Sequence, residues 1–192
     1  HKKFGESTAV LAGNSLLTLA FEILTDSKLK ISSKKKNLLV NLISKSSGHS
    51  GIAGGQFSDL SFEKKRVSLS KIVEMQIKKT GKLFCFCCFA PALIDGDKED
   101  FKKFNKIGEN IGLLFQIADD LIDFKGNTHK AGKKTKKDFV RGKATLISLL
   151  GYKNTVNYSN KIKMNTLKIL KKYGKNSSDL IDTIEFISNR EK

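Results

Sequence analysis

Apolar residues recur at spacings of three and four along most of the chain, which is the pattern of helices that each bury one face. Strand-like alternation is hard to find, and the 192 residues include a single proline, Pro91. The pattern therefore predicts an all-helical fold. Helices are expected at about residues 10–24, 34–46, 69–90, 98–124, 145–150, 159–173 and 178–188.

Three segments interrupt this pattern. The glycines at 48, 51, 54 and 55 are expected to break or loosen the second helix at its end. Pro91 with the following IDGDKED predicts a turn, and Asp97, Glu99 and Asp100 suit the first turn of the next helix. Residues 125–144 lack periodicity and are rich in lysine and glycine, which predicts a long loop of the kind that is usually functional or disordered.

The helix expected at 98–124 combines an apolar face with a polar stripe. The apolar face is predicted to contain Ile107, Ile111, Leu114, Phe115, Ala118 and Ile122. Gln116, Asp119, Asp120 and Asp123 follow the spacing i, i+3, i+4 and i+7, so they line one side of the same helix. Stacked carboxylates repel, and Mg²⁺, which prefers oxygen ligands and phosphate oxygens, is the natural compensating cation. A solvent-facing acidic patch is the alternative interpretation.

The chain is strongly basic, with a formal net charge of +17 and only three arginines. Lysine excess indicates a general affinity for anions, although a solvated lysine-rich surface without a specific partner would look the same. Lysines at 130, 133, 134, 136 and 137 follow the aspartates, and Lys78, Lys79 and Lys82 lie on the preceding helix. Carboxylates, magnesium and lysines in one place would form a diphosphate-binding site.

Length and cysteine content set further bounds. The chain is long enough to form one domain with its own hydrophobic core. Cys85, Cys87 and Cys88 lie in one apolar run without a second ligand cluster, which disfavours zinc and predicts buried thiols in a reducing compartment. The apolar run 83–94 is too short to span a bilayer. We therefore expect a cytoplasmic protein without stable membrane insertion.

Five motifs in order resemble the polyprenyl synthetases, that is, the trans-isoprenyl diphosphate synthases of the short-chain farnesyl and geranylgeranyl type. HKKFGE with AVLAGNSLLTLAFEIL is similar to the segment that follows the family's first aspartate-rich motif. The other similar segments are GIAGGQFSDL at 51–60, KTGKL at 79–83, FQIADDLIDF at 115–124, and GKKT at 132–135 continuing into GKATLISLLG at 142–151.

The resemblance implies an isoprenoid synthase-like helical bundle with a deep central cavity, usually as a homodimer. It implies a magnesium-dependent prenyltransferase that condenses an allylic diphosphate with isopentenyl diphosphate. Asp119, Asp120 and Asp123 would bind magnesium, and Asp119, Asp120 and Lys79 would be catalytic. The diphosphate would be bound by Lys79, Thr80, Gln116 and Lys133, with Gln56 and Asp59 supporting that site.

The sequence departs from the family pattern at its start. The family's first aspartate-rich motif and the residues that hold isopentenyl diphosphate precede the segment that matches HKKFGE. We therefore expect residues 1–192 to form a single, partial polyprenyl synthetase domain, the C-terminal portion of a longer synthase without its N-terminal helices, and to be inactive alone. Product length depends on side chains before the first motif, so the sequence leaves it open.

Two other functions remain possible at this stage. A truncated or regulatory synthase-like subunit would keep the fold without the chemistry. A lysine-rich helical nucleic-acid-binding protein would explain the charge, but it leaves the aspartate stripe unexplained, because aspartates repel phosphates without an intervening metal. We therefore expect no nucleic-acid partner.

Overall fold

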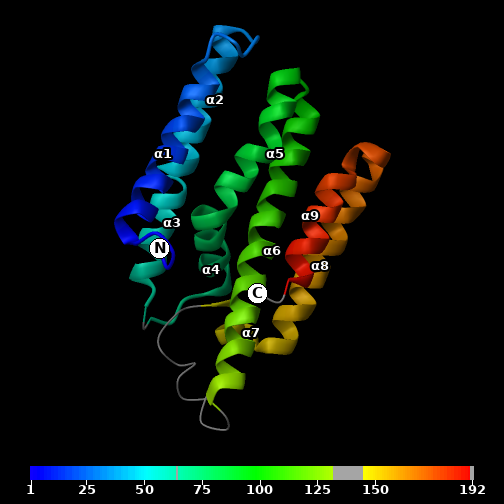
Figure 1. Ribbon diagram of the computed structural model, residues 1–192. Coiled ribbons are helices and arrows are strands. Elements are labelled where there is room, and N and C mark those ends of the chain that lie inside the picture. Colours follow the sequence, from blue (N-terminus) through cyan, green and yellow to red (C-terminus); the bar gives the residue numbers. More distant parts are fainter. Residues whose placement is uncertain (64, 132–144, 191–192) are drawn as a thin grey trace. The chain divides into compact units, whose positions relative to one another are not determined.

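The structure is a computed structural model that describes residues 1–63, 65–131 and 145–190, with the backbone alone for 127–131. It divides into two compact units, residues 1–44 and 45–192. Every element in the described ranges is a helix, as predicted (Figure 1). The single partial domain and its central cavity stay predictions.

The first unit contains α1 (Glu6–Thr25) and most of α2 (Ser33–Ser47). α1 ends at Asp26, whose carboxylate accepts a hydrogen bond from the Lys28 N–H at 2.7 Å and whose carbonyl accepts one from the Lys36 ammonium. α1 is long and apolar enough to cross a membrane, by length and composition only. Core helices and signal sequences share these properties, so the expectation of no stable membrane insertion stays a prediction.

The second unit is organised around one long helix, α6 (Lys98–Ala131), which contacts α4, η1, α5, α7, α8 and α9. Figure 1 shows α6 in green, running the length of this unit. The elements are α3 (Ile52–Ser61), α4 (Leu69–Gln76), the π-helix η1 (Ile77–Gly81), α5 (Lys82–Asp95), α6, α7 (Leu146–Leu150), α8 (Tyr152–Leu170), the 3₁₀ helix η4 (Lys171–Ser177) and α9 (Ser178–Asn189).

α6 is buried on two faces rather than one. The predicted face packs against the end of α8 and against α9 in a cluster of Ile107, Ile111, Leu114, Leu170, Ile184 and Ile187. A second face, which the sequence analysis missed, joins Leu113 and Ile117 to α4 and α7 through Ile72, Met75 and Leu146. Packing on both faces fixes the rotation of α6, and therefore the direction of its polar stripe.

The predicted helix end before Pro91 is wrong, because α5 continues through the proline to Asp95, whereas the predicted turn within IDGDKED is confirmed at Gly96 and Asp97. The helix ends instead at Gly96, whose φ of 101° lies in the left-handed region. The N–H groups of Gly96 and Asp97 both donate to the Ala92 carbonyl, which is the hydrogen-bond pattern of a glycine C-cap. The predicted start of α6 is confirmed, since an Asp97 carboxylate oxygen accepts from the Glu99 and Asp100 N–H groups at 2.8 Å.

Other predicted boundaries also change. Gly54 and Gly55 lie inside α3 rather than breaking the chain there, and α6 extends past residue 124 into the predicted loop. The remainder of that loop, at 132–144, lies outside the described residues. α8 begins at Tyr152 rather than near residue 159, and its first turn is anchored by fully buried Thr155, whose hydroxyl donates to the Gly151 carbonyl at 2.9 Å.

The three cysteines differ in exposure. Cys85 is buried and Cys88 partly buried, but Cys87 is exposed, so the prediction of three buried thiols is wrong for that residue. Burial raises the pKa of Cys85 to about 12 and that of Cys88 to about 11. Both thiols are therefore protonated and unreactive at neutral pH.

Candidate diphosphate and metal site

Two glycines bring three elements of the second unit into backbone contact. A Cβ atom on Gly55 of α3 would lie 2.2 Å from the Lys79 nitrogen, and one on Gly112 of α6 would lie 2.4 Å from the Gly81 Cα atom. Neither distance is possible for a real side chain. Only glycine therefore allows α3 and α6 to approach η1 this closely, and η1 carries Lys79 and Thr80.

η1 is a π-helical turn between α4 and α5, where the sequence predicted one continuous helix. The Lys82 N–H donates to the Ile77 carbonyl five residues back, which accommodates one more residue than an α-helical turn. Such insertions change the directions of the neighbouring side chains and occur frequently at functional sites. Lys79 and Thr80 both lie within this turn.

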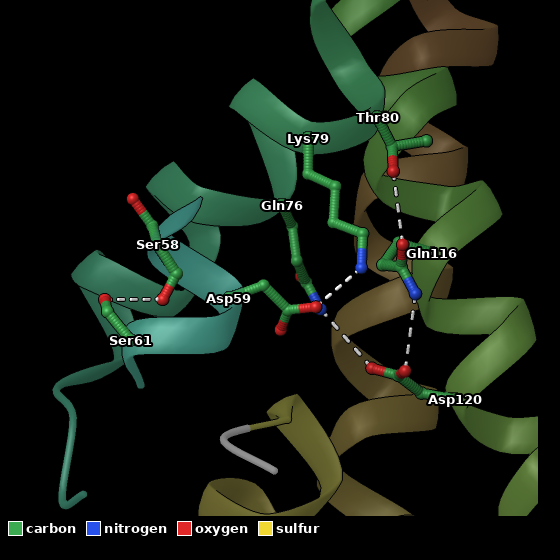
Figure 2. A network of polar contacts seen from close by, with 8 residues as sticks. All are labelled: Ser58, Asp59, Ser61, Gln76, Lys79, Thr80, Gln116 and Asp120. Atoms are coloured by element: carbon green, nitrogen blue, oxygen red, sulfur yellow. Dashed lines mark hydrogen bonds and ion pairs between the residues drawn. The ribbon is translucent and has the colours of Figure 1, made fainter. Parts of the chain in front are cut away.

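Lys79 and Thr80 each bond to a predicted site residue on another helix (Figure 2). The Lys79 ammonium lies 2.6 Å from a carboxylate oxygen of Asp59 on α3. The Thr80 hydroxyl donates to the Gln116 side-chain oxygen on α6 at 3.2 Å. The structure thus brings together four residues from three of the motifs identified in the sequence.

Asp120 connects to the same network through two amide groups (Figure 2). Gln116 donates to one carboxylate oxygen at 3.4 Å, and Gln76 at the end of α4 donates to the other at 3.3 Å. Burial raises the pKa of Asp120 to about 6, against the lowering effect of the Gln116 hydrogen bond. The negative charges of Asp119, Asp123 and Asp59 raise it further, so the site is short of positive charge.

Asp119 faces a different neighbour from Asp120. Its carboxylate forms an ion pair with Arg190, which follows α9. The same guanidinium donates to the Phe115 carbonyl at 3.2 Å and lies 4.1 Å from the centre of the Phe115 ring. The adjacent residues Asp119 and Asp120 therefore contact different neighbours: Asp119 pairs with an arginine, and Asp120 accepts from two amides.

Two further predicted site residues, Asp123 and Gln56, lie outside this hydrogen-bond network. Asp123 is exposed on α6, one turn beyond Asp119 and Asp120. Gln56 is exposed on α3, and within the described residues no hydrogen bond joins it to Asp59 or Lys79. Lys133, Lys134, Lys136 and Lys137 lie outside the residues that the structure describes.

Sequence reasoning missed Gln76 and Arg190. Gln76 carried a usable signal, because it precedes Lys79 and Thr80 by three and four residues and so shares their helical side. Arg190 carried only a weak one, as one of three arginines in a lysine-rich chain. Its partners are more than 70 positions away, and only the packing of α9 on α6 shows them.

The residues present fit a magnesium ion that also binds a phosphate group. Within the described ranges no three carboxylate, histidine or cysteine groups converge closely enough to enclose a metal. Mg²⁺ does not need such an enclosure, since it commonly uses one or two carboxylates and completes its octahedron with water and phosphate oxygens. The pKa of the Asp120 carboxylate is raised by burial and by three other carboxylates, and a divalent cation would compensate both effects. The side-chain oxygen of Gln76, buried without a partner in the described structure, is a further acceptor there.

Comparison with known proteins agrees with the motifs. The sequence model of the Polyprenyl synthetase family matches residues 1–187. The chain belongs to the polyprenyl synthetase family. The farnesyl diphosphate synthase of Bacillus subtilis is 39% identical over 152 residues, which cover 78% of this chain and 51% of that protein.

Solved structures of polyprenyl synthetases share the fold. An FPP/GFPP synthase from Zymomonas mobilis is 34% identical with a TM-score of 0.80, covering 97% of this chain and 63% of that one. A geranyltransferase from Helicobacter pylori, complexed with magnesium and isoprenyl diphosphate, is 29% identical with a TM-score of 0.73 and covers 98% and 62%. The chain thus spans between half and two thirds of the length of these relatives.

Proposed function

We propose that the protein containing this chain is an isoprenyl diphosphate synthase, which condenses an allylic diphosphate with isopentenyl diphosphate. The observation that carries the proposal is the convergence of Lys79, Thr80, Gln116 and Asp120 on one polar site formed by η1 and α6. The donor groups of Lys79 and Thr80 lie beside the Asp120 carboxylate, which could bind a metal. This arrangement suits a diphosphate that is bound both directly and through a metal ion.

The carboxylates and the hydrogen-bond donors of the site have different roles. Asp119, Asp120 and Asp123 are the residues that would hold magnesium, and magnesium bound there would supply positive charge for the departing diphosphate. The Lys79 ammonium donates to diphosphate oxygens. Thr80 would donate to the diphosphate by turning its single hydroxyl proton away from the Gln116 side-chain oxygen, and the Gln116 amide orients Asp120. Lys133 is proposed as a further diphosphate ligand, and Asp59 and Gln56 as supporting residues.

The bond changes follow from this arrangement. The allylic carbon–oxygen bond breaks, and its electron pair leaves with the diphosphate, where Lys79 and the other donors stabilise the developing charge. The double bond of isopentenyl diphosphate then attacks the allylic carbon, and loss of a proton restores a double bond. The homodimer stays a prediction from the family resemblance, and the cytoplasmic location stays a prediction from the sequence.

The test uses the complete natural protein that contains these residues. It is incubated with labelled isopentenyl diphosphate, magnesium and allylic diphosphates of increasing length, and the products are separated by chain length. We expect a prenyl product longer by one or more isoprene units, and its length identifies the enzyme type. A well-folded complete protein that incorporates no label would contradict the proposal.

Two variants assign the activity to this site. Asp120→Asn should reduce turnover about 100-fold or more, because it removes a metal ligand with little change in shape. Asp182→Asn is the matched control, since it removes the same charge from an exposed position on α9. Equal turnover of the two variants would show that Asp120 has no catalytic role.

A further inference from the structure

Arg190 is held against α6 by three separate contacts. Its guanidinium pairs with the Asp119 carboxylate, donates to the Phe115 carbonyl at 3.2 Å and stacks 4.1 Å from the centre of the Phe115 ring. The Arg190 side chain is 14% exposed, whereas that of Asp119 is 42% exposed. The arginine is thus the more buried member of the pair, which distinguishes it from an ordinary surface ion pair.

The burial makes Asp119 the counter-ion that Arg190 needs. A guanidinium stays charged at every physiological pH, so it cannot neutralise itself by losing a proton. Its Nε atom is already buried without a partner in the described structure. Without the Asp119 carboxylate, the Arg190 guanidinium would contact only the carbonyl and the ring of Phe115 among the described residues. A buried charge without a counter-ion destabilises the folded protein.

Asp119 is also a metal ligand under the proposed function, and this inference rests on that assignment. We propose that Arg190 is a built-in competitor of the divalent cation for Asp119, so that a metal binds this carboxylate only when the guanidinium leaves it. Two cations repel when they share one carboxylate, and the guanidinium already occupies the Oδ1 oxygen of Asp119. Each metal-binding event is therefore coupled to release of Arg190 from α6.

The coupling is reciprocal, which makes it measurable from both sides. Removal of Arg190 should tighten metal binding, and metal binding should loosen Arg190 and the end of α9. We expect about a tenfold change in metal affinity, within the usual range for coupled sites. The competition involves Asp119 alone, so it should disappear when that carboxylate is absent.

Mn²⁺ is the probe, because its free form is measured directly by electron paramagnetic resonance without any reaction. The complete protein is titrated with Mn²⁺ as wild type, Arg190→Gln and Arg66→Gln. Arg66 is exposed and loses the same charge on substitution, so it controls for net charge. We expect Arg190→Gln to bind Mn²⁺ about tenfold more tightly than Arg66→Gln, and Arg190→Gln to have no further effect in an Asp119→Asn background.

Hydrogen exchange of the wild-type protein provides a second readout that needs no variant. The amides of Ser188, Asn189 and Arg190 should exchange faster when Mn²⁺ is bound. Equal affinities of the two arginine variants, or unchanged exchange in protein that binds Mn²⁺, would overturn the competition while leaving the metal site intact. If neither the wild type nor Arg190→Gln binds Mn²⁺, the metal role of Asp119 fails, and the competition fails with it.

Discussion

The ammonium nitrogen of Lys79 lies 2.6 Å from a carboxylate oxygen of Asp59, although 20 positions separate the two residues. Their side chains are 31% and 19% exposed, so the pair is largely removed from water. It joins α3 to the π-helical turn at the point where Gly55 allows their backbones to meet. The same ion pair holds the diphosphate-binding lysine of the proposed site in position.

Lys79→Met should destabilise the protein by about 1–3 kcal/mol, because it leaves the mostly buried Asp59 carboxylate without its partner. Lys78→Met is the matched control, since Lys78 forms only an i,i+4 pair with Glu74 whose two side chains are 37% and 63% exposed. That change should alter the free energy of unfolding much less, because an exposed ion pair is screened by water. Urea denaturation measures both, and equal effects would show that the Lys79 pair contributes no more than a surface pair.

Gly112→Ala should separate α6 from η1 and break the hydrogen bond between Thr80 and Gln116. The new methyl group would lie 2.4 Å from the Gly81 Cα atom, so we expect a loss of about 1–3 kcal/mol in the free energy of unfolding. Gly126→Ala on the same helix meets nothing within 4 Å and should stabilise the protein by up to about 1 kcal/mol. Thermal denaturation distinguishes the two, and a neutral Gly112→Ala would refute the close contact.

Gln76→Leu should separate function from stability. The leucine fills a similar volume and removes a buried oxygen that has no partner in the described structure, so the free energy of unfolding should change by less than about 1.5 kcal/mol. Asp120 loses one of its two amide donors, and turnover of the complete protein should fall about tenfold. Met75→Leu, at the neighbouring buried position, should preserve both quantities. Turnover that does not distinguish the two variants would show that Gln76 only fills space.

The sequence predicted which residues form the site better than it predicted which neighbours they contact. The spacing of Gln116 and Asp120 places them one turn apart on any helix, and the structure joins them at 3.4 Å. Asp119 and Asp120 are adjacent, so their side chains diverge by about 100° around the helix. Which neighbour each one meets depends on the packing of η1 and α9 against α6, and no local pattern contains that information.

Local rules also failed where tertiary packing overrides them. Pro91 removes one helical hydrogen bond, but Ala92 in the following turn is buried, so α5 continues until Gly96. The π-helical turn is invisible to periodicity, because Gln76, Lys79 and Thr80 keep a spacing that is equally regular in an α-helix. Gly55 looked like a helix breaker, whereas its role is to admit the backbone of Lys79.

Tyr173 provides a pH-dependent test of the packing between α6 and the segment after α8. Its hydroxyl donates to an Asp100 carboxylate oxygen at 2.6 Å. Burial, this hydrogen bond and the charges of Asp100 and Asp97 raise the pKa of Tyr173 to about 12, against the opposing charge of Lys103. The unfolded pKa is about 10. Because folding raises this pKa, the stabilisation is fully present below pH 10 and is lost as the pH rises from about 10 to about 12.

Alkaline titration followed by tyrosinate absorbance measures this shift. The difference between the wild type and Tyr173→Phe isolates one of the three tyrosines. In folded protein the difference curve should have its midpoint near pH 12, and in concentrated urea the midpoint should fall to about 10. A folded midpoint near 10 would mean that Tyr173 does not donate to Asp100 in solution, and that the start of α6 is held by its other contacts alone.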